Sequence, residues 1–224
     1  MDSRRLKAAN LHDEILERAA DLFGRRGYDS VSMREISEAC GVSKPALYYH
    51  FASKEAIGKA LVDEVYDSLN SVMDDFAKNP PAETIEAMIL IVDSFRRLAD
   101  RRPLLLLFVM RSSMGGDEDI LVNYIDQQNK VVQQKLTALL FAYEQAGKLQ
   151  TGSTRLLVLN LFGVLLSSFV ARMRGVIKTY DDAFVRAICA NLIFGVSSDP
   201  MERAKFKDCD SVFASALSSW ECGK

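Results

Sequence analysis

Residues 32–54, SMREISEACGVSKPALYYHFASK, contain two short helical patterns separated by a tight turn. Ser32 is a capping residue at the start of the first pattern, and Gly41 ends that pattern. Ser43 begins the second pattern, with Pro45 in its first turn, where a missing N–H costs little. Two short helices joined in this way are typical of a helix-turn-helix, whose second helix enters the major groove of DNA.

The second pattern is too polar to form only protein core. Ser43 and Lys44 lie at its N-terminus, where unpaired N–H groups and the helix dipole favour phosphate. The small side chain of Ala46 allows close approach to base edges. Hydroxyl, imidazole and ammonium groups follow, of the kinds that donate most hydrogen bonds to DNA phosphates: Tyr48, Tyr49, His50 and Lys54. The pattern therefore predicts a DNA-binding helix.

The segment resembles the DNA-binding domain of the TetR family of bacterial transcription regulators. The similarity extends from Ile15 to Ile57, and four short motifs carry it: Arg34-Glu35-Ile36, Gly41-Val42-Ser43, the run from Ala46 to Phe51, and Ser53-Lys54-Glu55. The all-helical remainder has the length that this resemblance implies.

The resemblance implies a role in DNA binding for ten residues. Ser32 and Arg34 would contact the backbone; Ser43, Lys44, Pro45 and Ala46 would face the groove; Tyr48, Tyr49, His50 and Lys54 would hold phosphates. We expect one tyrosine ring to pack under the next helix while its hydroxyl faces phosphate. The alternatives are that the tyrosines only pack and that His50 only caps. We expect His12 to be a solvated residue.

Outside this segment, apolar residues recur at helical spacing almost from end to end. The pattern predicts a first helix that ends near Gly27. It predicts further helices over approximately residues 53–76, 85–99, 103–114, 117–146, 154–174 and 182–196, and a last one around Phe213 to Trp220. We expect Arg4, Arg5 and Lys7 to form either a minor-groove arm or a solubilising tail. The predicted fold is all-α, with a three-helix DNA-binding domain at 1–55 and a helical effector-binding and dimerisation domain at 56–224.

Composition excludes several classes of protein. The chain has 224 residues, of which 49% are hydrophobic and 26% charged, as in ordinary globular proteins. Its net charge of −2 excludes a uniformly basic surface, although residues 1–60 hold ten Lys/Arg and nine Asp/Glu. The four cysteines form no CxxC pair, so we expect neither a metal site nor a cofactor. We find no catalytic motif and expect no enzyme activity.

Localisation follows from the apolar segments. The N-terminus has no apolar core of a signal peptide. The most apolar stretch, 156–171, is shorter than the ~20 residues that a membrane span needs. We therefore expect a cytoplasmic protein without a membrane partner, and a buried or interface helix at this stretch.

The larger domain is expected to dimerise and to bind an effector. The helix near 154–174 is apolar on every side and must be covered on every side. The resemblance implies a homodimer through this helix and the one near 182–196. Adaptable apolar side chains that form either an effector pocket or ordinary core are Met73, Met88, Phe95, Phe108, Met110, Tyr124 and Phe162. Asn160 would orient a ligand, bond a neighbouring helix or cross the dimer interface.

Three functions remain open at this point. The first is a repressor that binds a palindromic DNA operator as a dimer and is released by a small, hydrophobic effector. The second is a DNA-binding protein of the same fold that acts through a protein partner without a small-molecule effector. The third is a ligand-binding or enzymatic helical protein with a vestigial motif, which the intact Lys44–Lys54 region disfavours.

Overall fold

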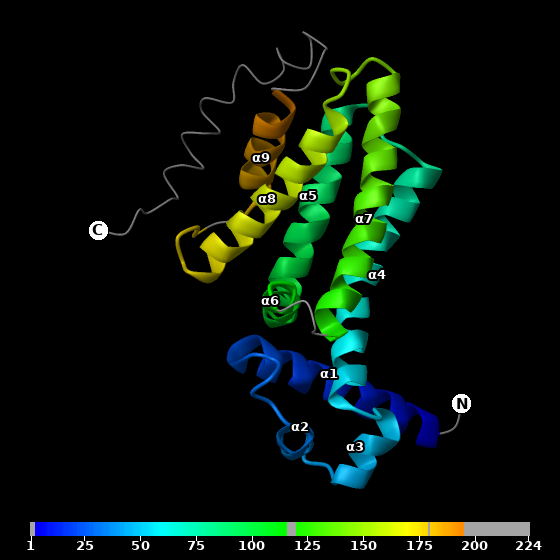
Figure 1. Cartoon of the computed structure of the whole chain (residues 1–224), viewed down its shortest axis with the longest axis vertical. Coiled ribbons are helices and arrows are strands. Elements are labelled where there is room, and N and C mark those ends of the chain that lie inside the picture. The colour runs from blue at the N-terminus through cyan, green and yellow to red at the C-terminus, as the bar shows by residue number, and fades with distance from the viewer. Residues whose placement is uncertain (1–2, 116–119, 179, 195–224) are drawn as a thin grey trace. The chain divides into compact units, whose positions relative to one another are not determined.

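The computed structural model describes residues 3–115, 120–178 and 180–194, and side chains from residue 11 to residue 193 within these ranges. The described part contains helices and no β-strand, which confirms the predicted all-α class (Figure 1). The helices are α1 (Ser3–Arg26), α2 (Met33–Ala39), α3 (Lys44–His50), α4 (Lys54–Lys78), α5 (Thr84–Arg101), α6 (Pro103–Ser112), α7 (Ile120–Gln145), α8 (Thr154–Met173) and α9 (Asp182–Phe194). The helix predicted around Phe213 to Trp220 lies outside the described residues.

The chain forms two compact units, and α4, α5 and α7 contribute residues to both. The N-terminal unit consists of Met1–Ser68 and Asp100–Lys130, and the C-terminal unit of Leu69–Ala99 and Val131–Lys224. The helices predicted to bind DNA thus belong to a unit larger than residues 1–55. The boundary at residue 55 stays a prediction.

In the N-terminal unit, α1 and α6 pack at very short range. A Cβ atom at Gly24 would lie 2.4 Å from the carbonyl oxygen of Leu104, so only glycine allows this approach. Arg111 donates a hydrogen bond to the Gly24 carbonyl at 2.9 Å. The rings of Phe23 and Phe108 lie 5.2 Å apart beside this contact. Arg4, Arg5 and Lys7, expected to form a minor-groove arm or a solubilising tail, belong to α1, which begins at Ser3; their contact with a minor groove stays a prediction.

The C-terminal unit contains α8, α9, residues 84–99 of α5, residues 69–78 of α4 and residues 131–145 of α7. Glu144 of α7 caps α8: its carboxylate accepts from the backbone N–H groups of Gly152 and Thr154 at 2.8 and 3.0 Å. This capping satisfies N–H groups that a helix start leaves without an intrahelical partner. Helices α5 and α8 are also in contact, since the rings of Phe95 and Phe169 meet edge to face, with centroids 6.4 Å apart.

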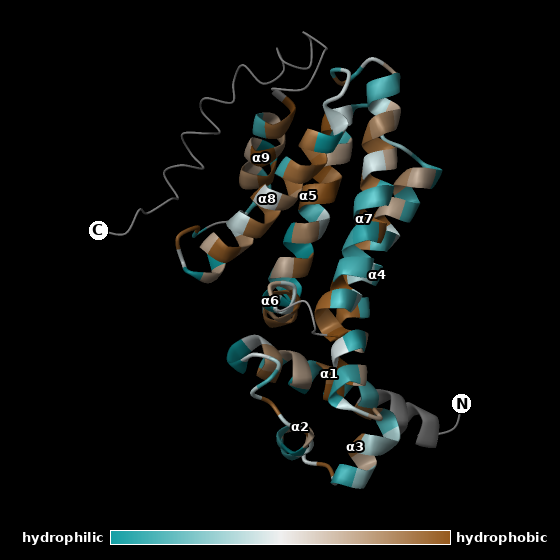
Figure 2. Cartoon of the chain, in the orientation of Figure 1, coloured by the Kyte–Doolittle hydropathy of each residue, from teal (hydrophilic) through white to brown (hydrophobic). Residues whose placement is uncertain are grey.

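Helix α8 is the most apolar long helix of the described residues (Figure 2). It is the one described helix that passes a length-and-hydropathy test for a membrane span. A side of α8 is buried in the chain: Leu157, Val158, Leu161, Leu165, Ser168 and Phe169. Core helices of soluble proteins pass the same test, so this result is weak support for a membrane segment.

Candidate nucleic-acid interface

The start of α2 is fixed by a reciprocal cap. The backbone N–H of Glu35 donates to Ser32 Oγ at 3.3 Å, and the backbone N–H of Ser32 donates to Glu35 Oε2 at 2.8 Å. The Ser32 hydroxyl also donates to that carboxylate at 2.8 Å. The proton of this hydroxyl is therefore used inside the protein, and contact of Ser32 with a DNA phosphate stays a prediction.

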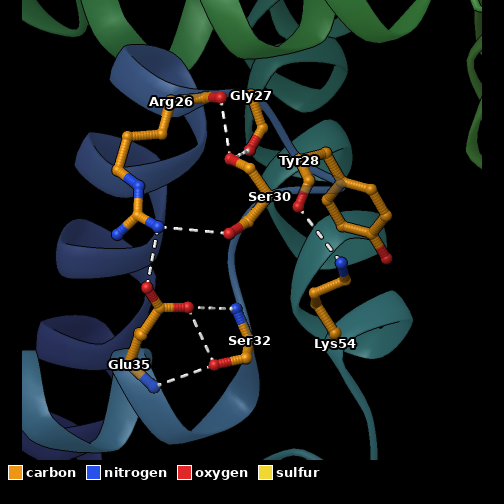
Figure 3. Close-up of polar contacts among 7 residues, drawn as sticks. All are labelled: Arg26, Gly27, Tyr28, Ser30, Ser32, Glu35 and Lys54. Atoms are coloured by element: carbon orange, nitrogen blue, oxygen red, sulfur yellow. Dashed lines mark hydrogen bonds and ion pairs between the residues drawn. The ribbon is translucent and has the colours of Figure 1, made fainter.

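Glu35 also joins α2 to the end of α1 (Figure 3). Arg26 Nη2 donates to Glu35 Oε1 at 2.7 Å and to the Ser30 carbonyl at 3.2 Å. Hydrogen bonds from Ser32, followed by that from Arg26, lower the pKa of the Glu35 carboxyl to about 2. The carboxylate is thus charged at neutral pH and holds α2 against the turn after α1.

The turn between α2 and α3 depends on one glycine. Gly41 has a φ of 66°, in the left-handed region that other residues rarely adopt. The backbone N–H of Val42 donates to the Ser37 carbonyl at 3.0 Å and closes the turn. Ser43 caps α3, because its hydroxyl oxygen accepts from the Ala46 N–H at 3.3 Å. These contacts set the direction in which α3 leaves the turn.

Helix α3 turns one side chain inward and leaves a polar face exposed. Leu47 is fully buried, while Lys44 and Pro45 are exposed. Tyr48 is 50% exposed and Tyr49 84% exposed. The expected burial of one tyrosine ring is wrong, because Leu47 alone of this helix enters the core and the tyrosines beside it in sequence point away.

The other polar residues of the predicted interface have protein partners. Arg34 is 71% exposed, and its guanidinium donates to Glu38 at 2.7 Å, which raises the pKa of Arg34. His50 ends α3 with its ring centroid 6.3 Å from that of His12. His12 stacks on Phe51 at 4.7 Å. The His12 side chain remains 43% exposed, and the expectation that it is a solvated residue rather than a site stays a prediction.

Lys54, expected to hold a phosphate, is partly buried. Its Nζ donates to the Tyr28 carbonyl at 3.1 Å and lies 4.2 Å from the centroid of the Tyr28 ring (Figure 3). The spacing of the motif contained no signal for this contact, because Tyr28 lies 26 residues earlier in the chain.

The predicted effector residues are divided between the two units. Phe108, Met110 and Tyr124 belong to the N-terminal unit. Phe108 joins the ring cluster of Phe23, and the Tyr124 hydroxyl donates to Asp63 at 2.5 Å, which raises the Tyr124 pKa. The remaining members belong to the C-terminal unit: Met73, Met88, Phe95, Asn160 and Phe162.

Within the C-terminal unit, the predicted residues differ in burial. Met73, Met88 and Phe95 are buried, and Phe162 is half-buried. Asn160 is exposed on α8 and does not reach the interior of its own chain. The sequence pattern did not indicate Asn70 of α4: within the described part of the chain, its Oδ1 is buried without a hydrogen-bond donor. The sequence around this single asparagine mixes exposed and apolar positions, so it does not predict that the side-chain oxygen is buried.

Comparison with known sequences supports the helix-turn-helix. The profile of the family described as bacterial regulatory proteins, tetR family, matches residues 15–61. The biofilm operon icaADBC HTH-type negative transcriptional regulator IcaR of Staphylococcus aureus (strain Newman) is 35% identical over 63 residues. The match covers 28% of this chain and 34% of that relative, so the chain aligns with about a third of the relative's length.

Solved structures extend the similarity to the whole fold. The fatty acid degradation regulator FadR from Bacillus halodurans superposes with a TM-score of 0.69 at 23% identity, covering 83% of this chain and 95% of that one. The SmeT–triclosan complex superposes with a TM-score of 0.70 at 17% identity, covering 85% and 93%. At these identities, the likeness concerns the fold alone.

Proposed function

Because this chain belongs to the TetR family of bacterial regulatory proteins, we propose that it represses transcription by binding a palindromic operator as a homodimer. The observation that carries the proposal is α3: a short helix, capped by Ser43, that exposes Lys44, Tyr48 and Tyr49. A capped helix of this kind fits a major groove. Such a protein acts in the cytoplasm as a regulator and not as an enzyme.

We assign the contacts by their place on the two helices. Ser43, Lys44, Pro45 and Ala46 form the start of α3 and face base edges, while Tyr48, Tyr49 and His50 lie further along and face phosphates. Arg34 on α2 reaches the backbone, and Ser32 contributes mainly as the cap of α2. This division follows the general rule that phosphate contacts position a protein and base contacts specify the sequence.

The homodimer is proposed to form through α8 and α9. Large apolar side chains are exposed on α8 at helical spacing, with Leu156 56% and Leu159 68% exposed. Gly163 follows on the same side, and a Cβ atom there would meet nothing within 4 Å. Neighbouring exposed apolar side chains commonly mark an interface. Asn160 lies among these residues, which favours its role at the interface over a role toward a ligand.

The proposed effector is a small, largely apolar molecule bound in the C-terminal unit. Met73, Met88 and Phe95 are buried there and supply adaptable apolar contact. The buried Oδ1 of Asn70 would accept a hydrogen bond from the effector. Two proteins of the same fold support the effector class, since one is named a fatty acid degradation regulator and the other is in complex with triclosan.

The alternative is a DNA-binding protein of this fold that responds to a protein partner. Exposed apolar residues outside α8, such as Phe141 on α7, favour this reading because they offer a second surface. Tight DNA binding that is indifferent to metabolites but sensitive to a partner would support the alternative.

Selection of genomic DNA fragments by the purified protein tests the proposal. We expect a palindromic site and a steep salt dependence, because six to ten neutralised phosphates correspond to a loss of ~10³–10⁵ in affinity between 50 and 200 mM salt. The complex is then screened against a metabolite library for release. A flat salt response on the best fragment would contradict DNA binding as the function.

A further inference from the structure

The first residue of α4 holds the turn that follows α1. Lys54 donates to the backbone carbonyl of Tyr28 at 3.1 Å, and its ammonium lies 4.2 Å from the centroid of the same residue's ring. The two contacts come from different parts of Tyr28, so they fix both its backbone and its side chain (Figure 3). A cation over a ring face and a charge-assisted hydrogen bond reinforce each other at a partly buried site.

Tyr28 is itself confined by three helices of the N-terminal unit. Its ring lies 5.0 Å from that of Phe23 on α1 and 6.0 Å from that of Phe108 on α6. A Cβ atom at Gly58 of α4 would lie 3.2 Å from Tyr28 Cε2, so α4 approaches the ring closely. Tyr28 therefore has little room to move, and Lys54 is bonded to a fixed point.

The contact closes a loop that contains the DNA-binding helices. Residues 29–53 lie between the two partners in sequence and include all of α2 and α3. Arg26 and Glu35 hold the first part of this loop against α1 at 2.7 Å. Lys54 holds the other end of this loop, directly after residues 51–53, which connect α3 to α4. The position of α3 thus depends on this contact.

We propose that Lys54 is a positioning residue for DNA binding, acting through Tyr28 to hold α3 in place rather than by binding a phosphate. The inference rests on the proposed function and changes the role that the sequence resemblance implies for this residue. It separates Lys54 from Lys44, whose side chain is exposed at the start of α3.

The salt dependence of operator binding tests the two roles. Each phosphate contact contributes about 0.9 to the slope of log affinity against log salt concentration. We expect Lys54→Met to weaken binding on the order of tenfold at a fixed salt concentration with an unchanged slope. The control Arg34→Met, which removes the proposed backbone contact of α2, should lower the slope by about 0.9. A slope lowered in both variants would overturn the positioning role.

A double-mutant cycle with Tyr28 supplies the second readout. Tyr28→Phe retains the ring and the carbonyl, so Lys54→Met should have its full effect in that background. Tyr28→Leu removes the ring, and the effect of Lys54→Met should be clearly smaller there. Lys54→Arg, which preserves the cation over the ring, should restore most of the affinity. Effects that simply add in the Tyr28→Leu background would overturn the coupling.

Circular dichroism and thermal unfolding of each variant establish that the chain is folded before binding is compared. If Lys54→Met does not fold, Lys54→Arg and Tyr28→Leu still form a test, since the positioning role predicts rescue by the first and an unchanged slope in the second. A wild-type protein with no salt-dependent DNA binding overturns the proposed function and this inference together. Salt-dependent wild-type binding with a lowered slope for Lys54→Met overturns this inference alone.

Discussion

At the residue scale, hydrogen bonds inside the protein decide which polar groups of the motif remain for DNA. The Ser32 hydroxyl and the Lys54 ammonium donate to protein oxygens, whereas Lys44 and Tyr49 are exposed. A motif read from the sequence ranks these residues alike, because it records the residue type and not the partner. The exposed residues of α3 are therefore the proposed DNA contacts, and the residues bonded within the protein fix the position of the helices.

Glu35 gives a pH-dependent test of that geometry. Its pKa is lowered from 4.5 to about 2 in the folded chain, so its contribution to stability is complete above about pH 4.5 and is lost as the pH falls towards 2. Glu35→Gln should lower the thermal unfolding temperature at pH 7, and the difference from wild type should shrink between pH 4.5 and 2. Melting curves followed by circular dichroism measure this. A difference that does not change with pH would show that the charge of Glu35 is unimportant.

At the element scale, the sequence predicted helices well and their surroundings poorly. Caps and breakers are local, so Ser32, Ser43 and Gly41 marked the true ends of α2 and α3. The side that a helix buries depends on residues far along the chain. Asn160 was expected to need a partner inside an apolar helix, yet it is exposed because α8 buries only part of its circumference. Phe108 was expected in either an effector pocket or ordinary core, and it packs in the ring cluster with Phe23.

The contact of α1 with α6 is tested by adding one methyl group. Gly24→Ala places a Cβ atom 2.4 Å from the Leu104 carbonyl oxygen, so the helices must move apart. We expect a loss of ~1–3 kcal/mol in the free energy of unfolding, as for other overpacked sites. Chemical denaturation measures the loss, with Asp21→Ala on the exposed side of α1 as the control. A stable Gly24→Ala variant would mean that α1 and α6 are not closely packed in solution.

The proposed dimer interface is tested on α8. Leu159→Asp places a charge on an exposed position, so the single chain should fold normally while an apolar interface loses several kcal/mol. Sedimentation should then show a monomer that no longer binds the operator. Phe141→Asp on α7, also at an exposed apolar position, is the control and should remain a dimer.

If Leu159→Asp stays dimeric, the interface lies elsewhere on the chain. A monomeric Phe141→Asp variant would move it to the exposed side of α7. Either result would leave the helix-turn-helix assignment intact, since the residues of α3 are unchanged in both variants.

At the scale of the whole molecule, α4 is the element that begins beside α3 and continues into the C-terminal unit. It starts at Lys54, bonded to Tyr28, and contains Asn70 and Met73 further along. A ligand that contacts the second half of α4 can influence the first half only if it binds two arrangements of the chain with different affinities. Continuity of the helix provides the physical connection between the proposed effector site and the proposed DNA site.

Linkage between the two sites makes the last prediction quantitative. A coupling free energy of ~1–3 kcal/mol corresponds to a ~5–150-fold loss of operator affinity when the effector binds, and thermodynamics requires operator DNA to weaken effector binding by the same factor. Titrating the effector by calorimetry, with and without saturating operator, measures both. The Asn70→Leu variant should weaken effector binding, because it removes the buried acceptor, while leaving operator affinity without effector unchanged. Equal effector affinities in the two titrations would exclude coupling, even for a ligand that binds tightly, and the response would then have to come from a protein partner.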